Sequence, residues 1–239
     1  MNEKTPENIE DGEIIVLFFN LNSDEDEYES LFKNLPDHEQ HRANEFQYLN
    51  DRIGYTKCRN VLRKTLATWL GCEPKKLNIT CSEYGKPYLE HSQKIEFNIT
   101  HTKGLAAIAF SKTFTIGIDT ENTEREVNLV HLSEKVFNEK ERFLINSEKP
   151  HNQNKMFFRL WTSKEAFLKN TGLGLRLDPK KINVTPSVKK GNNGRVECHE
   201  VKASPSQLIE LKCQEPYVTT LCTSEKGTKN IKTIFFKPL

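Results

Sequence analysis

Apolar and polar positions along the chain follow two periods, one typical of strands and one typical of helices. Residues 14–20 form a short apolar run that predicts a buried first strand. Between Asp51 and Gly71, apolar residues recur every three or four positions, which predicts a helix that ends at the glycine. Three extended runs follow, at residues 94–100, 105–110 and 114–121. The short polar turns between these runs predict an antiparallel meander packed on the helix.

The second half of the chain repeats this combination of helices and strands. A helical block capped by Ser133 and a polar loop at residues 147–154 precede the strongest helical pattern, which covers residues 155–170. Four further strands are expected, at residues 182–184, 196–201, 217–222 and 231–236. This order of elements favours an α+β fold of two lobes, residues 1–113 and 114–239, over the alternating βαβ units of a nucleotide-binding fold.

The composition excludes several classes of protein. A chain of 239 residues with 36% hydrophobic content can form a core, but it has no apolar run of the ~18 residues that a membrane span requires. The first thirteen residues carry five carboxylates and no apolar segment, which argues against a secretory signal. Lys and Arg number 35 and Asp and Glu 33, a balance that does not indicate nucleic-acid binding. We therefore expect a cytoplasmic protein that binds neither nucleic acid nor membranes.

Common metal and nucleotide motifs are missing from the sequence. The six cysteines form no CxxC pair, and the seven histidines form no HExxH motif, so neither a zinc site nor a dithiol redox site is expected. The chain also has no GxxxxGK[ST] phosphate loop and no GxGxxG fingerprint. Candidate chemistry must therefore come from carboxylates and from polar turns.

Two carboxylates point the same way from the third extended run. Side chains alternate along a strand, so Asp119 and Glu121 share a face with Gly117, opposite the apolar face. Residues two apart on a strand lie ~7 Å from one another, which is close enough to hold one cation between them. The alternative is an exposed strand end with ordinary acidic residues, and the spacing alone favours that alternative.

A third carboxylate falls within the apolar stripe of the second long helix. Glu165 follows Trp161 by four residues and precedes Leu168 by three, so it faces the core and requires a partner. Lys169, four residues further, offers a simple salt bridge on the same helix face. In the other interpretation, Glu165 joins a buried polar site in which Lys169 serves an anion. Three clustered carboxylates would repel one another without a divalent cation, and oxygen ligands favour Mg²⁺ or Mn²⁺ over zinc.

Four segments, in this order and spacing, resemble the 4′-phosphopantetheinyl transferases, specifically the longer, two-lobed Sfp-type group. They are the Tyr-Gly-Lys-Pro turn at residues 84–87, the strand end Phe-Asn-Ile-Thr-His-Thr at 97–102, the Gly-Ile-Asp-Thr-Glu strand at 117–121 and the Trp-Thr-Ser-Lys-Glu-Ala helix at 161–166. The resemblance implies two similar lobes related by a pseudo-twofold, each an antiparallel sheet packed on a long helix. It also implies a monomer with coenzyme A in the cleft between the lobes.

The activity implied by the resemblance is transfer of the 4′-phosphopantetheine arm of coenzyme A to a serine hydroxyl. The acceptor would be an apo acyl carrier protein or peptidyl carrier domain of fatty-acid, polyketide or nonribosomal-peptide synthesis, and adenosine 3′,5′-bisphosphate would leave. By the family pattern, Asp119, Glu121 and Glu165 would hold Mg²⁺ on the coenzyme A pyrophosphate. Glu165 is also the candidate general base, directly or through a water, and Lys169 would neutralise charge that develops during transfer.

The same resemblance implies contacts to the remainder of coenzyme A. Thr100 and His101 would contact the nucleotide end, with His101 on a phosphate. Lys86 and Pro87 would clamp the adenine and add a cation. Arg52 is the nearest match to the residues that meet the 3′-phosphate in the family.

The chain departs from the family pattern beside Arg52. The family often has an arginine two residues later, and this chain has Gly54 there. Lys57 or Arg59 could replace that arginine.

Two further functions compete with the transferase. One is a non-catalytic module that binds coenzyme A and carrier proteins, and the other is a metal-dependent phosphohydrolase. A non-catalytic member would be expected to have lost Asp119, Glu165 or Lys169, and all three are intact. We therefore expect an enzyme.

Overall fold

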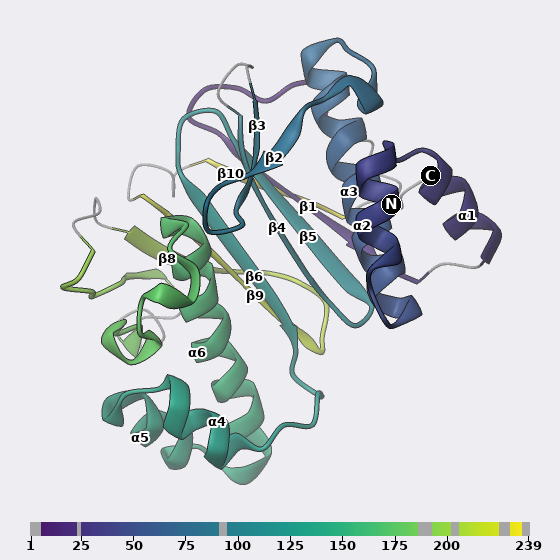
Figure 1. The fold of residues 1–239 in the computed structure, drawn as a ribbon. Helices are drawn as coiled ribbons and strands as arrows, with labels where there is room; N and C mark the ends of the chain where they lie inside the picture. The colour runs from purple at the N-terminus through teal and green to yellow at the C-terminus, as the bar shows by residue number, and fades with distance from the viewer. Residues whose placement is uncertain are drawn as a thin grey trace.

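The protein folds into two lobes, each built from a sheet and one long helix (Figure 1). The computed structural model describes residues 6–22, 25–90, 95–185, 193–201, 206–224 and 230–235. The long helices are α3 (Leu49–Leu70) and α6 (Pro150–Thr171), of 22 residues each. Each ends at a glycine with a positive φ, Gly71 or Gly172, as the sequence predicted. The α+β class and the two sheet-and-helix lobes are confirmed.

The first sheet has four strands in the order β10-β1-β5-β4. They are β1 (Ile14–Asn20), β4 (Glu96–Thr102), β5 (Leu105–Ser111) and β10 (Ile231–Phe235). The β1–β5 and β5–β4 pairs are antiparallel, and β10 joins parallel to β1. Alternate residues of β1 face opposite cores, one shared with α3 and the other with the second sheet, which explains why six of its seven residues are buried.

The second sheet is antiparallel, in the order β6-β9-β8-β7. Its strands are β6 (Ile116–Asn122), β7 (Asn193–Arg195), β8 (Ser206–Leu211) and β9 (Tyr217–Ser224). Helix α6 packs on β6 and β9, and two short helices, α4 (Leu129–Val136) and α5 (Glu139–Ser147), pack on α6.

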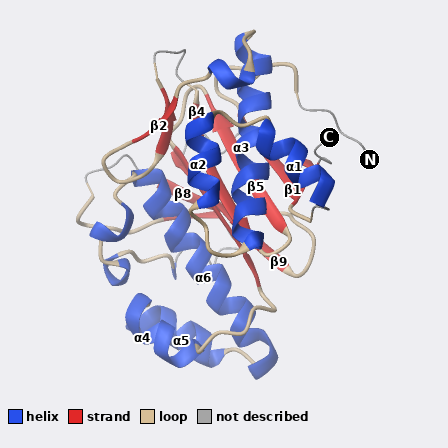
Figure 2. Cartoon of the chain, turned by 45° about the vertical axis from the view of Figure 1, so that its right-hand side comes forward, coloured by secondary structure: helices blue, strands red, loops and turns tan. Residues whose placement is uncertain are grey.

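Shorter elements complete the first lobe. Helices α1 (Glu25–Lys33) and α2 (Asp37–Asn44) lie beside α3 over the first sheet (Figure 2). A small hairpin of β2 (Ile79–Cys81) and β3 (Pro87–Leu89) carries the predicted Tyr-Gly-Lys-Pro turn. Single 3-10 turns occupy Pro74–Lys76, Gly174–Arg176 and Pro179–Lys181. None of the helices in the described ranges combines the length and apolarity of a membrane span.

The predicted three-stranded meander is wrong about its third strand. β4 and β5 do pair, but β6 opens the second sheet and pairs with β9, about a hundred residues later. Periodicity identifies strands but not their partners. The strand expected at 231–236 returns to the first sheet as β10, and residues 94 and 236 lie outside the described part of the chain. The division at residues 113 and 114 stays a prediction.

Several local expectations in the second lobe also change. Ser133 lies buried inside α4, and the caps are Asn128 for α4 and Asn138 for α5. Helix α6 begins at Pro150, inside the expected polar loop. Its first turns are largely solvent-exposed and polar, so they show no apolar periodicity in the sequence. The strands expected at 182–184 and 196–201 reduce to a single bridge between Asn183 and Glu197, whereas β8 was not predicted.

Candidate active site

Helix α6 makes an unusually close approach to strand β6 at Gly117. A Cβ added to Gly117 would lie within 3.0 Å of backbone atoms of Ala166 and Asn170, so no larger residue fits without moving the helix. The approach places Glu165 and Lys169 of α6 beside the carboxylate face of β6. The absence of a side chain at Gly117 therefore allows α6 and β6 to come close enough to form one site.

Lys169 and Asp119 form the central ion pair of this contact. The ammonium Nζ of Lys169 lies 2.7 Å from Oδ1 of Asp119 and also donates to the carbonyl oxygen of Ile118 at 3.1 Å. Glu165 and Lys169 both line the pocket, as their shared helix face predicts, but the ion pair of Lys169 is with Asp119. Asp119 is only 6% exposed, and its second oxygen, Oδ2, is buried without a hydrogen-bond partner in the described structure.

The other two predicted metal ligands have perturbed pKa values. Burial, followed by the negative charge of Asp119, raises the pKa of Glu121 from 4.5 to about 7, against the opposing effect of Arg125 at 3.3 Å. Burial and then Asp119 likewise raise the pKa of Glu165. Both carboxyl groups therefore lie in the field of Asp119, in surroundings poor in water.

The site suits a hard cation that would bind carboxylate oxygens. Oδ2 of Asp119 is buried, accepts no hydrogen bond from the described part of the chain and is therefore available as an oxygen ligand for a cation. A cation would also offset the repulsion from Asp119 that helps to raise the pKa values of Glu121 and Glu165. Within the described ranges, no three His, Cys, Asp or Glu side chains already converge on one ion-sized position.

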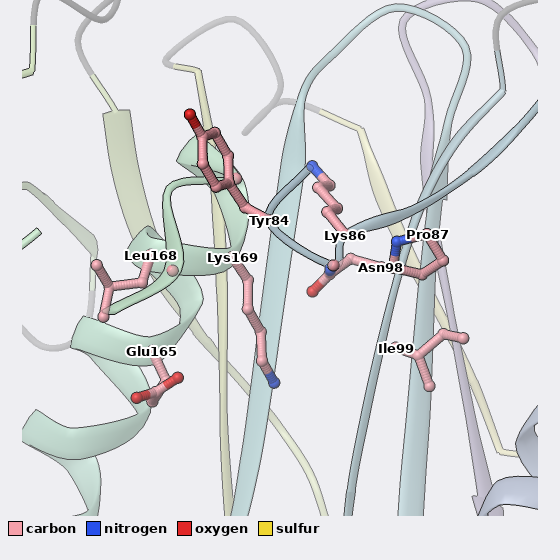
Figure 3. A pocket seen from close by; sticks show the side chains of 11 residues that line it. Tyr84, Lys86, Pro87, Asn98, Ile99, Glu165, Leu168 and Lys169 are labelled. Carbon is pink, nitrogen blue, oxygen red and sulfur yellow. The ribbon is translucent and has the colours of Figure 1, made fainter. Parts of the chain in front are cut away.

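A pocket of about 350 Å³ opens beside this ion pair (Figure 3). Glu165, Leu168 and Lys169 of α6 line one side, and the opposite side comes from the β2–β3 turn and from β4. Figure 3 shows Lys169 extending from α6 across the pocket, with Glu165 one helical turn earlier. The remaining lining residues are Tyr84, Gly85, Lys86, Pro87, Asn98, Ile99, Gly172 and Gly174. The pocket thus unites three of the four segments singled out from the sequence and adjoins the fourth.

Thr100 makes its hydrogen bonds within the protein. Its side chain is buried, donates to Oδ1 of Asp119 at 3.1 Å and accepts from the backbone N–H of Thr120 at 3.1 Å. The hydroxyl is therefore engaged inside the protein. It orients Asp119 from the first lobe.

His101 packs against the position where the chain departs from the family pattern. Its imidazole ring lies 3.6 Å from where a Cβ on Gly54 would be. Burial by neighbouring atoms and then the charge of Lys169 lower the pKa of His101, so the ring is neutral near pH 7. The residue as a whole is still exposed to solvent.

Three basic residues of α3 bond to other groups of the first lobe. Arg52 donates to the carbonyl oxygen of Phe46 at 2.9 Å and does not line the pocket. Lys57 is buried against Glu27 at 3.1 Å, and Arg59 pairs with the buried Glu39 at 3.0 Å. Neither Lys57 nor Arg59 is free to replace an arginine at position 54.

Sequence reasoning missed the role of Asn98. This residue lines the pocket, and its Oδ1 accepts from the backbone N–H of Ile118 at 2.8 Å. The available signal was an asparagine inside an otherwise apolar strand segment, because a buried amide requires hydrogen-bond partners.

Comparison with known proteins gives one consistent result. The 4′-phosphopantetheinyl transferase superfamily matches residues 115–222, and the N-terminal region of 4′-phosphopantetheinyl transferases matches residues 21–113. The 4′-phosphopantetheinyl transferase HetI of Nostoc sp. is 34% identical over 171 residues, 70% of this chain and 72% of HetI. The transferase gsp of Aneurinibacillus migulanus is 27% identical over 77% of this chain and 75% of its own length. Sfp of Bacillus subtilis is 28% identical over 49% of this chain and 51% of Sfp.

The two-lobed fold, and the acidic and lysine side chains where the lobes meet, are those of a group-transferring enzyme. The chain belongs to the 4′-phosphopantetheinyl transferase superfamily, in its two-domain, Sfp-type group. It is a 4′-phosphopantetheinyl transferase, and the prediction of an enzyme of this family is confirmed.

Proposed function

We propose that this enzyme transfers the 4′-phosphopantetheine arm of coenzyme A to the serine hydroxyl of an apo acyl carrier protein or peptidyl carrier domain. The serine oxygen forms the new bond to phosphorus, and adenosine 3′,5′-bisphosphate leaves. The observation that supports this best is the buried Asp119, with one oxygen paired to Lys169 and the other unpartnered, at the edge of a pocket.

Asp119, Glu121 and Glu165 are the residues that would hold Mg²⁺. When bound, the ion neutralises pyrophosphate charge and polarises the attacked phosphorus. The carboxylates offer only oxygen ligands, which also suits Mn²⁺. The unpartnered oxygen of Asp119 supports this assignment.

Glu165 and Lys169 are the residues proposed to act on the reacting groups. A glutamate whose pKa is raised by burial accepts a proton more readily, so Glu165 takes the serine proton, directly or through a water. Lys169 reaches the pocket with its ammonium already oriented by Asp119 and Ile118. A preoriented cation stabilises negative charge that grows on the leaving phosphate.

Lys86 and Pro87 line the pocket and are proposed to contact the nucleotide part of coenzyme A. His101 and Arg52 remain proposed contacts for its phosphates. Thr100 is proposed to act through Asp119 instead.

The test is an incubation of the purified protein with coenzyme A, Mg²⁺ and a panel of apo carrier proteins, read by intact mass. We expect a carrier to gain one phosphopantetheine arm, and a chelator to prevent the gain. Coenzyme A binding without transfer to any carrier would favour the non-catalytic carrier-binding module. Cleavage of coenzyme A with no carrier present would favour a phosphohydrolase.

A further inference from the structure

Strands β4 and β6 meet where the two lobes join, yet they belong to different sheets. They run in the same direction, because Asn98 contacts Ile118 and Thr102 contacts Glu121 further along both strands. In the part of the chain that the structure describes, no backbone hydrogen bond links the two strands. The edge of β6 that faces β4 therefore needs other partners for its buried backbone groups.

Side chains of β4 accept from the backbone N–H groups along this edge. Oδ1 of Asn98 accepts from Ile118 at 2.8 Å, and Oγ1 of Thr100 accepts from Thr120 at 3.1 Å. These two bonds replace the backbone ladder that a paired strand would provide. Both side chains are 4% exposed, so water does not compete with them.

Lysine side chains donate to the carbonyl groups of the same edge. Nζ of Lys86 lies 3.2 Å from the carbonyl oxygen of Ile116, and Nζ of Lys169 lies 3.1 Å from that of Ile118. Ile118 is thus fixed on both backbone groups, by Asn98 at its N–H and by Lys169 at its carbonyl. The next residue in the chain is Asp119.

We propose that Asn98 is a positioning residue, which fixes the backbone of β6 at Ile118 and thereby orients the Asp119 carboxylate toward Lys169 and the cation. This inference rests on the proposed function, because it assigns Asn98 a part in the same site. Thr100 orients the side chain of Asp119, and Asn98 orients the backbone that carries it. The direct alternative is that Asn98, which lines the pocket, contacts coenzyme A itself.

Variants of Asn98, with one control, separate these roles. Asn98→Leu removes the acceptor at similar side-chain size, and Asn98→Asp keeps an oxygen at the same place. Asn98→Ala is the substitute if the leucine variant does not fold. Phe97→Leu is the matched control, since Phe97 is the neighbouring buried residue on β4 but faces the core beneath α3.

The first measurement is hydrogen exchange at the Ile118 amide, without metal or coenzyme A, relative to amides of β5. In Asn98→Leu we expect exchange about tenfold faster, because the N–H loses its only described acceptor. Asn98→Asp should restore the wild-type rate. Phe97→Leu should alter β5 and β6 together and leave their ratio unchanged. An unchanged ratio in Asn98→Leu would overturn the inference.

The second measurement is transfer to a carrier as Mg²⁺ and coenzyme A are varied separately. We expect Asn98→Leu to raise the half-saturating Mg²⁺ concentration about tenfold and to leave KM for coenzyme A within about twofold. A raised KM for coenzyme A with unchanged Mg²⁺ dependence would overturn the positioning role in favour of direct contact. If the wild-type protein transfers nothing, the proposed function fails, while the exchange measurement still decides whether Asn98 holds β6.

Discussion

Asp119 uses its two carboxylate oxygens unequally. Oδ1 receives Lys169 and Thr100, whereas Oδ2 is buried with no partner in the described structure. A buried acceptor left unpaired costs about 1–3 kcal/mol, and a bound cation would supply the partner that no described protein group provides. The residue therefore links the first lobe, the lysine of α6 and the proposed ion.

The variant Asp119→Asn tests this link with almost no change in shape. It removes the charge that pairs with Lys169 and that would bind Mg²⁺, so we expect carrier modification to fall by at least about a hundredfold. The rate is measured by intact mass, and the thermal midpoint in chelator checks that the variant is folded. Turnover within a few-fold of wild type would contradict the metal assignment.

Glu121 gives a prediction about pH in the metal-free protein. Its pKa is raised from 4.5 to about 7, first by burial and then by Asp119, so the folded state binds a proton more tightly than the unfolded state. Its contribution to stability is therefore lost as pH rises from about 4.5 to about 7, at up to ~1.4 kcal/mol for each pKa unit. Denaturant unfolding in chelator at pH 5 and pH 8 measures this loss. Glu121→Gln should lose less over the same interval, and an identical loss in both proteins would contradict the shift.

The sequence identified the residues of the site better than their partners. Periodicity placed Asp119 and Glu121 on one face of a strand, and Glu165 and Lys169 on one face of a helix. Only the resemblance to the transferase family brought that strand and that helix to one site. Thr100 was assigned to coenzyme A instead, and Lys169 was open to a pair with Glu165. The bond from Thr100 to Asp119 depends on β4 meeting β6 across the lobes, and the pair of Lys169 with Asp119 depends on α6 meeting β6 within the second lobe. Local periodicity encodes neither contact.

The contact between α6 and β6 is the element on which the site depends. The sequence placed Gly117 on the carboxylate face, but not the helix backbone that presses on it. That information lies in the distance between two elements about 40 residues apart. The close approach is set by the backbone atoms of Ala166 and Asn170, whose positions depend on the tertiary fold.

Gly117→Ala should separate the two elements. The added methyl would overlap backbone that cannot rotate away, so α6 must shift and carry Glu165 and Lys169 with it. We expect destabilisation by about 1–3 kcal/mol, as for other overpacked sites, and a larger loss of transfer than this alone explains. Unfolding and turnover are compared with those of Gly104→Ala, which is destabilised by its positive φ of 88° and by the side-chain tip of Tyr217, and not by the backbone of α6. Near-normal activity in Gly117→Ala would show that the close approach is dispensable.

A second buried ion pair secures the same helix on its other side. Lys164 is 1% exposed, pairs with Glu141 of α5 at 2.8 Å and donates to the carbonyl oxygens of Pro179 and Ile182 at 2.6 Å. Glu141 in turn accepts from the backbone N–H of Val184. The lysine of the Trp-Thr-Ser-Lys-Glu-Ala segment is therefore structural, while its neighbour Glu165 faces the pocket.

Lys164→Met should be strongly destabilising. It leaves the Glu141 carboxylate buried without its cation, which typically costs about 3–5 kcal/mol. The double variant Lys164→Met with Glu141→Leu should recover part of this loss, because neither charge remains, while the backbone partners of both side chains stay unpaired. Lys180→Met is the control, because Lys180 is an exposed lysine in the 3-10 turn Pro179–Lys181. Equal stability of Lys164→Met and this control would show that the ion pair of Lys164 and Glu141 does not stabilise the fold.

At the scale of the whole molecule, the two lobes share a core. One apolar cluster contains Val16 and Phe18 of β1 together with Ile118 of β6 and Leu221 of β9. β10 crosses from the end of the second lobe to pair with β1, where Phe235 stacks on Phe18. The sequence predicted two lobes of like content but not this interlocking, because the strands involved are about two hundred residues apart.

The interlocked lobes should unfold in one step, and the two tryptophans can test this. Trp69 lies in the first lobe, edge-on to Phe110, and Trp161 lies in the second, stacked on Phe157. In Trp161→Phe the fluorescence reports the first lobe, and in Trp69→Phe it reports the second. We expect each variant's fluorescence midpoint in urea to coincide with its own far-UV circular dichroism midpoint, because each sheet loses the shared core when the other unfolds. A first-lobe fluorescence change that precedes loss of the circular dichroism signal would mean that the lobes are separable, and that the shared core and β10 contribute less than their burial indicates.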